Sequence, residues 1–382
     1  MLHGDRKREV SAMARQVLGG RDSVKVAAVQ AAPVFMDAQA TVEKGCRLIK
    51  QAGTEHADLV AFSETFIPGY PCYYTGGFDS PAPEWLDYNI ALQDNAIVIP
   101  GEETAAIGET AHQAGCYVVM GCNELDERRA SRTLYNTLVF LGRDGSLLGK
   151  HRKLMPTYTE RTYWGCGDGT DLRVFDTEIG SLGGLICWEH HMILARAAMI
   201  ELGEEIHVAV WPGTWRVGER MAEAETVAAS DCDLHPAIRE HAFEAGAFVI
   251  SVSGLMREQD VPRRWEHIQS SPRMNFAWAV GGSTIVSPMS QYLAEPVFNE
   301  ETIIYAECPA TMIKAAKVLF DSIGHYSRPD LLRLQVRRDR AAEPALSTMP
   351  PRDLLRRIAD TYEISEETLA AIVAELQKAS RG

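Results

Sequence analysis

The sequence lacks any long apolar run, since no stretch approaches the roughly 20 apolar residues that cross a bilayer. Residues 1–23 carry charges of both signs and no apolar segment like that of a signal peptide. Positive charge is also scarce: 38 lysines and arginines stand against 52 aspartates and glutamates, a net charge of -14. Because phosphate backbones and anionic membranes attract basic surfaces, we expect a cytoplasmic protein with neither a nucleic-acid nor a membrane partner.

Cysteine and histidine ligand patterns are missing as well. The eight cysteines include no CxxC pair and no spacing of a disulfide framework or zinc site. His190 and His191 are adjacent and cannot share one helix face, and His235 and His241 lack zinc spacing. We therefore predict reduced thiols and no bound metal.

Short apolar runs and helical patterns are what the sequence does contain. Hydrophobic residues make up 46% and charged residues 24%, as in an average globular protein. The apolar runs lack strict alternation, which favours strands buried on both faces and covered by helices, that is, an α/β layered fold. The expected strands are residues 24–30, 59–63, 117–121, 134–141, 182–186, 208–211 and 248–253. The expected helices are residues 41–52, 105–114, 194–202 and 236–245.

Turn signals and composition divide the chain further. The Arg143-Asp144-Gly145 turn predicts a hairpin whose second strand ends near Lys153. We expect an N-terminal extension over residues 1–23, the main domain over residues 24–330 and a C-terminal tail over residues 331–382. The alternation of Leu332, Leu334 and Val336 with polar residues predicts an edge strand in that tail, followed by two amphipathic helices beyond residue 350.

Reactive or charged side chains directly follow three of the apolar strands. Glu64 follows the second strand, Lys153 ends the hairpin, and Cys187 follows residues 182–186. Ligands of open α/β sheets bind outside the carboxyl ends of strands, so these three residues could converge on one pocket. A cysteine thiolate attacks carbonyl-like carbons when a base removes its proton and a cation favours its charge. Glu64 can be that base and Lys153 that cation. Lys153 and the backbone N–H of Trp188 are candidate donors to the charge that develops on a substrate.

Four sequence blocks around these residues resemble the nitrilase superfamily, and within it the nitrilase branch. They are residues 62–71, 151–157, 184–190 and 324–330, which stand in the order found in that family. One departure is the absence of a proline shortly after residue 190, a segment that flanks the substrate pocket in the family.

The resemblance implies a role for each matching residue. Glu64 would be the general base, Lys153 would stabilise the tetrahedral species, Cys187 would be the nucleophile, and Glu160 would position the lysine and the substrate. Trp188, Glu189 and His190 would form the oxyanion and substrate pocket. The implied fold is a four-layer α-β-β-α sandwich whose subunits pair as αββα-αββα. The implied assembly is a homo-oligomer that is built from dimers and can grow into a spiral or filament.

The implied reaction is the hydrolysis of a small nitrile to a carboxylic acid and ammonia through a thioimidate and a thioester on Cys187, with no cofactor. An amidase or carbamoyl hydrolase of the same superfamily is the alternative that shares these residues. A non-catalytic assembly or binding protein on the same fold is the alternative of another class. Assaying a nitrile and its amide separately distinguishes the enzymes, and the complete set of Glu64, Lys153 and Cys187 disfavours the non-catalytic protein.

Overall fold

Two sheets of six strands each form the centre of the fold. The computed structural model describes residues 16–71, 82–213, 234–268, 279–338 and 365. The first sheet has the order β12-β1-β2-β3-β4-β5, with β1, β2 and β3 parallel. Its strands are β1 (Ser23–Gln30), β2 (Leu59–Phe62), β3 (Tyr117–Leu125), β4 (Leu134–Leu141), β5 (Leu147–Arg152) and β12 (Thr302–Pro309).

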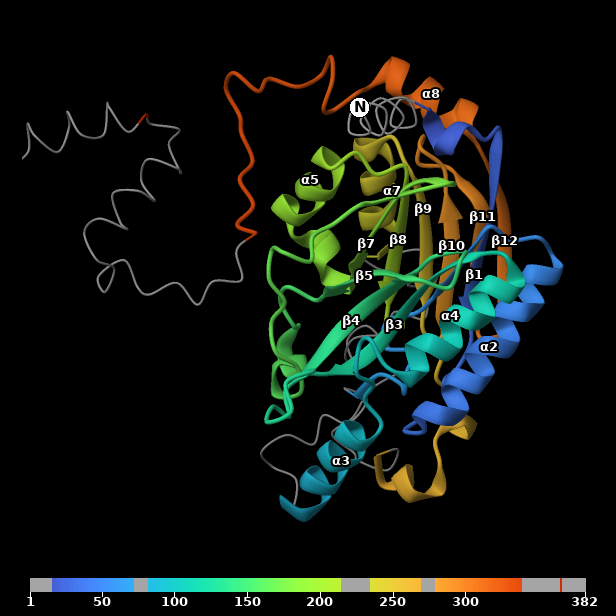
Figure 1. Ribbon diagram of the computed structural model, residues 1–382, viewed down its shortest axis with the longest axis vertical. Coiled ribbons are helices and arrows are strands. Elements are labelled where there is room, and N and C mark those ends of the chain that lie inside the picture. Colours follow the sequence, from blue (N-terminus) through green and yellow to red (C-terminus); the bar gives the residue numbers. More distant parts are fainter. Residues whose placement is uncertain (1–15, 72–81, 214–233, 269–278, 339–364, 366–382) are drawn as a thin grey trace, which may run out of the picture. The chain divides into compact units, whose positions relative to one another are not determined.

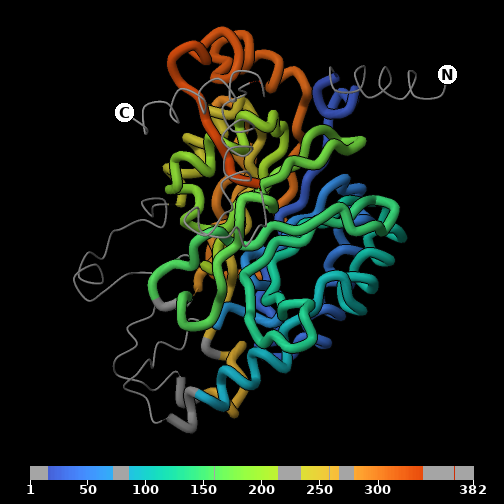
Figure 2. Tube along the Cα trace, turned by 60° about the vertical axis from the view of Figure 1, so that its left-hand side comes forward, coloured from blue at the N-terminus to red at the C-terminus, as the bar shows by residue number. Residues whose placement is uncertain are grey.

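The second sheet comes from the second half of the chain. Its order is β11-β10-β9-β8-β7-β6, with β7, β8 and β9 parallel. Its strands are β6 (Phe175–Thr177), β7 (Gly180–Ile186), β8 (Ile206–Trp211), β9 (Phe248–Ser253), β10 (Gly281–Val286) and β11 (Tyr292–Phe298). In Figure 2 the blue and teal first half therefore lies beside the yellow-green and orange second half, and β12 returns to the first sheet.

Helices cover the outer faces of both sheets, which makes the four α-β-β-α layers that the family resemblance implied (Figure 1). Helices α2 (Ala38–Thr54) and α4 (Glu102–Ala114) pack on the first sheet, and α5 (Ile193–Glu201) and α7 (Leu234–Ala245) pack on the second. The remaining helices, α3 (Ala82–Asp94) and α8 (Ala310–Leu319), lie outside these two pairs.

The apolar pattern of the strands explains the layers. Val26, Leu138 and Phe140 of the first sheet share one buried cluster with Ile186 and Val208 of the second. The opposite face of the first sheet packs against the apolar side of α2 and α4. Because both faces of the central strands are buried, the strands read as continuous apolar runs rather than as alternating ones.

Local signals fix the ends of the helices. The Asp37 side chain accepts a hydrogen bond from the Ala40 backbone N–H and caps α2. Gly115 ends α4 with a φ of 67°, a left-handed conformation that favours glycine. Within the described residues, no helix combines the length and the apolar character needed to cross a bilayer.

The seven expected strands, the four expected helices and the hairpin are confirmed, with ends shifted by a few residues. The apolar patterns of the sequence did not predict β6, β10, β11, β12, α3 or α8. Leu18, expected in an N-terminal extension, is fully buried in the cluster between the sheets. Residue 18 therefore contributes its side chain to the buried core.

The predicted edge strand at Leu332, Leu334 and Val336 was wrong, because these residues form no strand. Leu334 and Val336 instead pack against the cluster of Leu172 and the buried face of α5. Their alternation thus buries one side of an extended segment against a helix rather than against a sheet. The two expected C-terminal helices lie outside the described residues.

Candidate active site

The ends of β2, β5 and β7 bring Glu64, Lys153 and Cys187 together. The Lys153 Nζ donates to Glu64 Oε1 at 2.8 Å, and both side chains are buried. The charges of Glu64 and Lys153 both act on the pKa of Cys187. The convergence expected from the strand ends is therefore present in the structure.

Glu64 lies in a tight turn, and its side chain contacts the neighbouring strand β4. The Asn136 side chain on β4 donates to Glu64 Oε1 at 2.6 Å, and Glu64 Oε2 is buried without a hydrogen-bond partner. Burial, opposed by the Lys153 charge, raises the pKa of Glu64 to about 7. A carboxylate with a pKa near neutrality and an unpaired oxygen suits a general base.

A glycine makes that turn possible. A Cβ on Gly121 of β3 would lie 2.5 Å from the Thr65 backbone nitrogen and 2.8 Å from the Glu64 Cα, and closer still to the Ser63 carbonyl oxygen. Only a residue without a side chain lets β3 approach the Glu64 turn this closely.

Glu160 holds Lys153 from the other side. Lys153 Nζ lies 2.8 Å from Glu160 Oε2, and the Tyr70 hydroxyl donates to Glu160 Oε1 at 2.7 Å. Burial disfavours the ammonium, but Glu64, Cys187 and Glu160 outweigh it and raise the pKa of Lys153 well above its usual range. Lys153 is therefore charged, and Glu160 pairs with it rather than with Arg161, whose Nε donates to the Pro156 carbonyl.

Cys187 begins the short 3-10 helix η4 (Cys187–His191) with a left-handed φ of 54°, an uncommon conformation outside glycine. Burial and the charge of Glu64 raise the pKa of its thiol well above its usual range, while Lys153 and the Trp188 backbone N–H lower it. The group is thus a protonated thiol, which could act as a nucleophile only with the help of a base.

The side chains of Glu189 and His190 form hydrogen bonds with the backbone at and near Cys187. Glu189 accepts from the backbone N–H groups of Ile186 and Leu154, each at 2.7 Å, and lies 2.9 Å from His151 Nε2. His190 Nδ1 lies 2.7 Å from the Cys187 carbonyl oxygen. Both side chains therefore hold the turn that contains Cys187 in place.

The Trp188 side chain is not buried like those of Glu189 and His190 but is 41% exposed. Its ring makes edge contacts with Tyr158 and His191, at centroid distances of 5.7 Å and 5.9 Å. Among the residues expected to form the pocket, it is thus the one whose side chain reaches the surface next to Cys187.

Three residues of this site were not predicted from the sequence: Asn136, Gly121 and Tyr70. Asn136 had a signal, because it is a polar residue inside the apolar run of β4. Gly121 contacts the Glu64 turn and Tyr70 contacts Glu160, both far away in the sequence. No pattern in the residues next to Gly121 or Tyr70 predicts these contacts.

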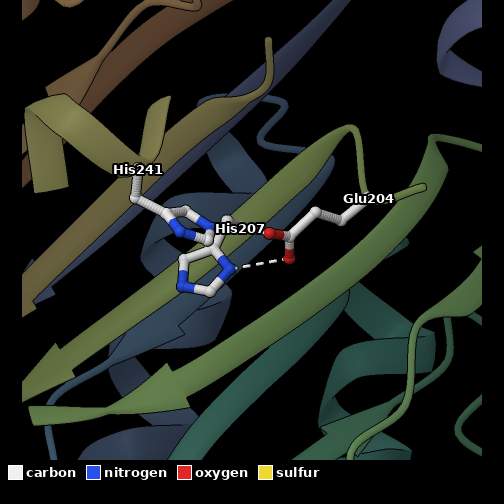
Figure 3. A group of neighbouring side chains, drawn as sticks. All are labelled: Glu204, His207 and His241. Atoms are coloured by element: carbon white, nitrogen blue, oxygen red, sulfur yellow. Dashed lines mark hydrogen bonds and ion pairs between the residues drawn. The ribbon is translucent and has the colours of Figure 1, made fainter. Parts of the chain in front are cut away.

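A second group of buried titratable residues lies beside the site. Figure 3 shows Glu204, His207 and His241, whose nitrogen and oxygen ligand atoms all lie within 4.8 Å of one another. Glu204 is 2.7 Å from His207 Nδ1 and 2.5 Å from His241 Nε2. Ligands of a tetrahedral zinc stand about 3.4 Å apart when each is about 2.1 Å from the ion. The group as it stands is therefore a hydrogen-bond network.

A surface hollow with a volume of about 470 Å³ lies elsewhere, at the opposite ends of the strands. It is lined by Tyr117 at the start of β3, by the turn between β4 and β5 and by the turn before β7. None of its lining residues belongs to the Glu64, Lys153 and Cys187 group.

Comparisons with known proteins agree with this geometry. The sequence profile of the family described as carbon-nitrogen hydrolase matches residues 25–318. A protein named Nitrilase 2 from an unknown prokaryotic organism is 38% identical, over 86% of this chain and 96% of its own. The bifunctional nitrilase/nitrile hydratase NIT4B of Nicotiana tabacum is 37% identical, over 85% of this chain and 89% of its own.

A solved structure shows the same fold. The carbon-nitrogen hydrolase from Helicobacter pylori G27 has a TM-score of 0.62 and 20% identity, covering 81% of this chain and 96% of that one. Together with the profile and the relatives, the sandwich and its three converging strand ends lead to one conclusion: the chain belongs to the carbon-nitrogen hydrolase family and is a nitrilase-type hydrolase of carbon–nitrogen bonds.

Proposed function

We propose that the enzyme hydrolyses an organic nitrile to the carboxylic acid and ammonia, with Cys187 as the nucleophile. The observation that carries the proposal is the buried Lys153, hydrogen-bonded to both Glu64 and Glu160 next to a buried thiol. Relatives that are named nitrilases support the choice of a nitrile.

In the first step, Glu64 takes the proton of the Cys187 thiol through its unpartnered Oε2 as the sulfur attacks the nitrile carbon. Negative charge develops on the nitrile nitrogen. One Lys153 N–H is held by Glu64 and another can serve both oxygens of Glu160, so the third can donate to that nitrogen. The proton on Glu64 then passes to the nitrogen, which gives a thioimidate.

In the second step, a water molecule adds to the thioimidate carbon as Glu64 accepts one of its protons. Glu64 returns this proton to the nitrogen and then transfers the hydroxyl proton to it as well, so that the carbonyl forms, ammonia leaves and a thioester remains on Cys187. A second water, deprotonated in the same way, releases the carboxylic acid and restores the thiol. The sum is one nitrile and two waters converted to one acid and one ammonia.

The same tetrahedral species can lose the thiol instead of ammonia, which yields an amide. Glu160 positions Lys153 for both outcomes, because it accepts from Nζ, the Tyr70 hydroxyl and the Thr157 backbone N–H at once. We propose Glu160 as a positioning residue and the Trp188 backbone N–H as a further donor to the reacting centre.

Intact mass spectrometry after mixing the protein with a nitrile panel tests the nucleophile. An imidate or acyl adduct on Cys187 is expected, and it should be absent in Cys187→Ala. Cys116→Ala is the matched control, because it removes another buried thiol that lies outside the site. Normal turnover by Cys187→Ala would overturn the assignment.

Assays of ammonia and acid with a nitrile, and separately with its amide, test the substrate. Ammonia and acid from the nitrile are expected. Acid from the amide alone would make the enzyme an amidase, and no product with no adduct would favour a binding protein. Two further predictions from the sequence stay predictions: a cytoplasmic location and a homo-oligomer built from dimers. Size-exclusion chromatography tests the homo-oligomer.

A further inference from the structure

A buried chain of hydrogen bonds leads from the Glu204 network to the backbone of the nucleophile. His190 on η4 connects the two, since its Nδ1 lies 2.7 Å from the Cys187 carbonyl oxygen and its Nε2 lies 2.9 Å from His207 Nε2 on β8. His207 Nδ1 then meets Glu204 Oε2 at 2.7 Å. The side chains that form this chain, Glu204, His207 and His190, are each at most 3% exposed.

The surroundings hold these side chains in place. The Trp211 ring stacks on His190 with a centroid distance of 4.9 Å and an interplanar angle of 28°. His241 Nε2 on α7 fixes the other oxygen of Glu204. Gly183 on β7 leaves the space for this carboxylate, because a Cβ there would collide with Glu204 Oε2. The rings therefore cannot turn to exchange partners.

The direction of the chain follows from its two ends. A carbonyl oxygen only accepts hydrogen bonds, so His190 carries a hydrogen on Nδ1. Burial, with His207 and His241 nearby, lowers the pKa of His190 well below its usual range, so this ring is neutral and its Nε2 is an acceptor. The hydrogen between the two rings consequently belongs to His207 Nε2.

That assignment requires one more proton in the Glu204–His207 contact. His207 already uses its Nε2 hydrogen toward His190, so the 2.7 Å bond to Glu204 contains a further proton on either His207 Nδ1 or Glu204 Oε2. Burial raises the pKa of Glu204, but His207 and His241 outweigh it and lower this pKa to about 2, so the pair is an imidazolium beside a carboxylate. Without this proton, a lone pair of His207 Nδ1 would face a lone pair of Glu204 Oε2, and the two atoms would repel each other.

We propose that Glu204 and His207 are positioning residues which, through His190, hold the Cys187 backbone in its left-handed reactive conformation only while they share one proton. The inference rests on the proposed role of Cys187 as the nucleophile. A fixed backbone keeps the sulfur aligned with Glu64 and Lys153, and a displacement of about 1 Å in such a site costs roughly 100-fold in rate.

The shared proton makes this support sensitive to pH. Burial lowers the pKa of His207, and the charges of His241 on α7 and His151 on β5 lower it further, while Glu204 raises it. The charge of His191 likewise lowers the pKa of His190. The support is present when the pair is protonated and is lost as the pH rises through the pKa of the pair.

Glu204→Gln separates this chain from a purely structural role. The glutamine oxygen can accept from His241, and its amide NH2 can donate to His207 Nδ1, which leaves the hydrogen on His207 Nε2. The chain then keeps its direction with no extra proton. Glu204→Ala and His207→Phe break it. His235→Phe is the matched control, because His235 is a buried histidine on α7 whose Nδ1 contacts the Tyr292 hydroxyl and not the chain.

The main readout is the alkylation rate of Cys187 by iodoacetamide, which requires no nitrile. Mass spectrometry of the tryptic peptide 174–196 reports it, because Cys187 is the only cysteine in that peptide. We expect Glu204→Ala and His207→Phe to slow alkylation by about 10- to 100-fold, Glu204→Gln to restore most of the rate at low pH, and His235→Phe to match the wild type.

The decisive quantity is the ratio of the Glu204→Gln rate to the wild-type rate across pH. The Glu64 titration cancels in this ratio, which should rise by about tenfold between about pH 5 and pH 9 as the wild type loses its shared proton. A flat ratio, or a Glu204→Gln variant as slow as Glu204→Ala, would overturn the proposal. Glu204→Gln is nearly isosteric with the wild type, so this test survives if the other variants fail to fold. Ammonia release from benzonitrile by the same proteins reports on the proposed function separately.

Discussion

Substitution of Gly121 by alanine tests how closely β3 must approach the Glu64 turn. The new Cβ would lie 2.5 Å from the Thr65 backbone nitrogen, a separation that real Cβ atoms do not show, so strand and turn must move apart by several tenths of an ångström or more. Overpacking of this kind costs about 1–3 kcal/mol of unfolding free energy. Because the moving turn contains Glu64, a shift that reaches about 1 Å lowers kcat by roughly 100-fold.

Ammonia release and denaturant unfolding together measure both effects. Gly45→Ala on α2 is the matched control, because its Cβ meets only the flexible Met120 methyl at 3.3 Å and the Phe66 ring at 3.6 Å. Alanine also favours a helix interior by about 1 kcal/mol relative to glycine. A Gly121→Ala enzyme with wild-type kcat and wild-type stability would refute the argument that this glycine positions the base.

Three further predictions concern charge and capping. Because the pKa of Glu64 is raised to about 7 and the base acts as a carboxylate, kcat/KM should fall as the pH falls through about 7, and a pH profile that stays level there would contradict the role of Glu64. Lys153→Met leaves Glu64 and Glu160 buried without their cation, so it should lower the unfolding free energy by about 3–5 kcal/mol and kcat by at least about 100-fold, and unchanged values would disprove the buried pairing. Asp37→Ala removes the cap of α2 and should cost about 1 kcal/mol in a denaturant titration without changing kcat, whereas an unchanged stability would count against the cap.

The catalytic candidates could be predicted because they break a local pattern. Glu64, Lys153 and Cys187 each stand where an apolar strand would otherwise continue, and that is visible in a window of a few residues. The layer architecture was predictable for the same reason, since buried parallel strands read as continuous apolar runs. The specific four-layer form came from the resemblance to a family.

The missed elements carry weaker local signals. Strand β12 is half exposed along much of its length, so its residues mix polar and apolar types. The Glu204–His207–His190 chain joins residues from a loop, a strand and a 3-10 helix, and the 33 residues between His207 and His241 give no ligand spacing. Such contacts depend on how β7 and β8 pair and where α7 packs, which only the tertiary structure determines.

The pairing of β1 with β12 has a consequence for synthesis on the ribosome. Ser23 pairs with Pro309 and Gln30 with Thr302, so one edge of β1 has no neighbour until residues 302–309 have been translated. At about 5–20 residues per second, that interval lasts roughly tens of seconds. An unpaired strand edge is a template for aggregation. A nascent chain stalled before residue 302 therefore leaves this edge of β1 unpaired, and an aggregation-prone edge persists until β12 is made.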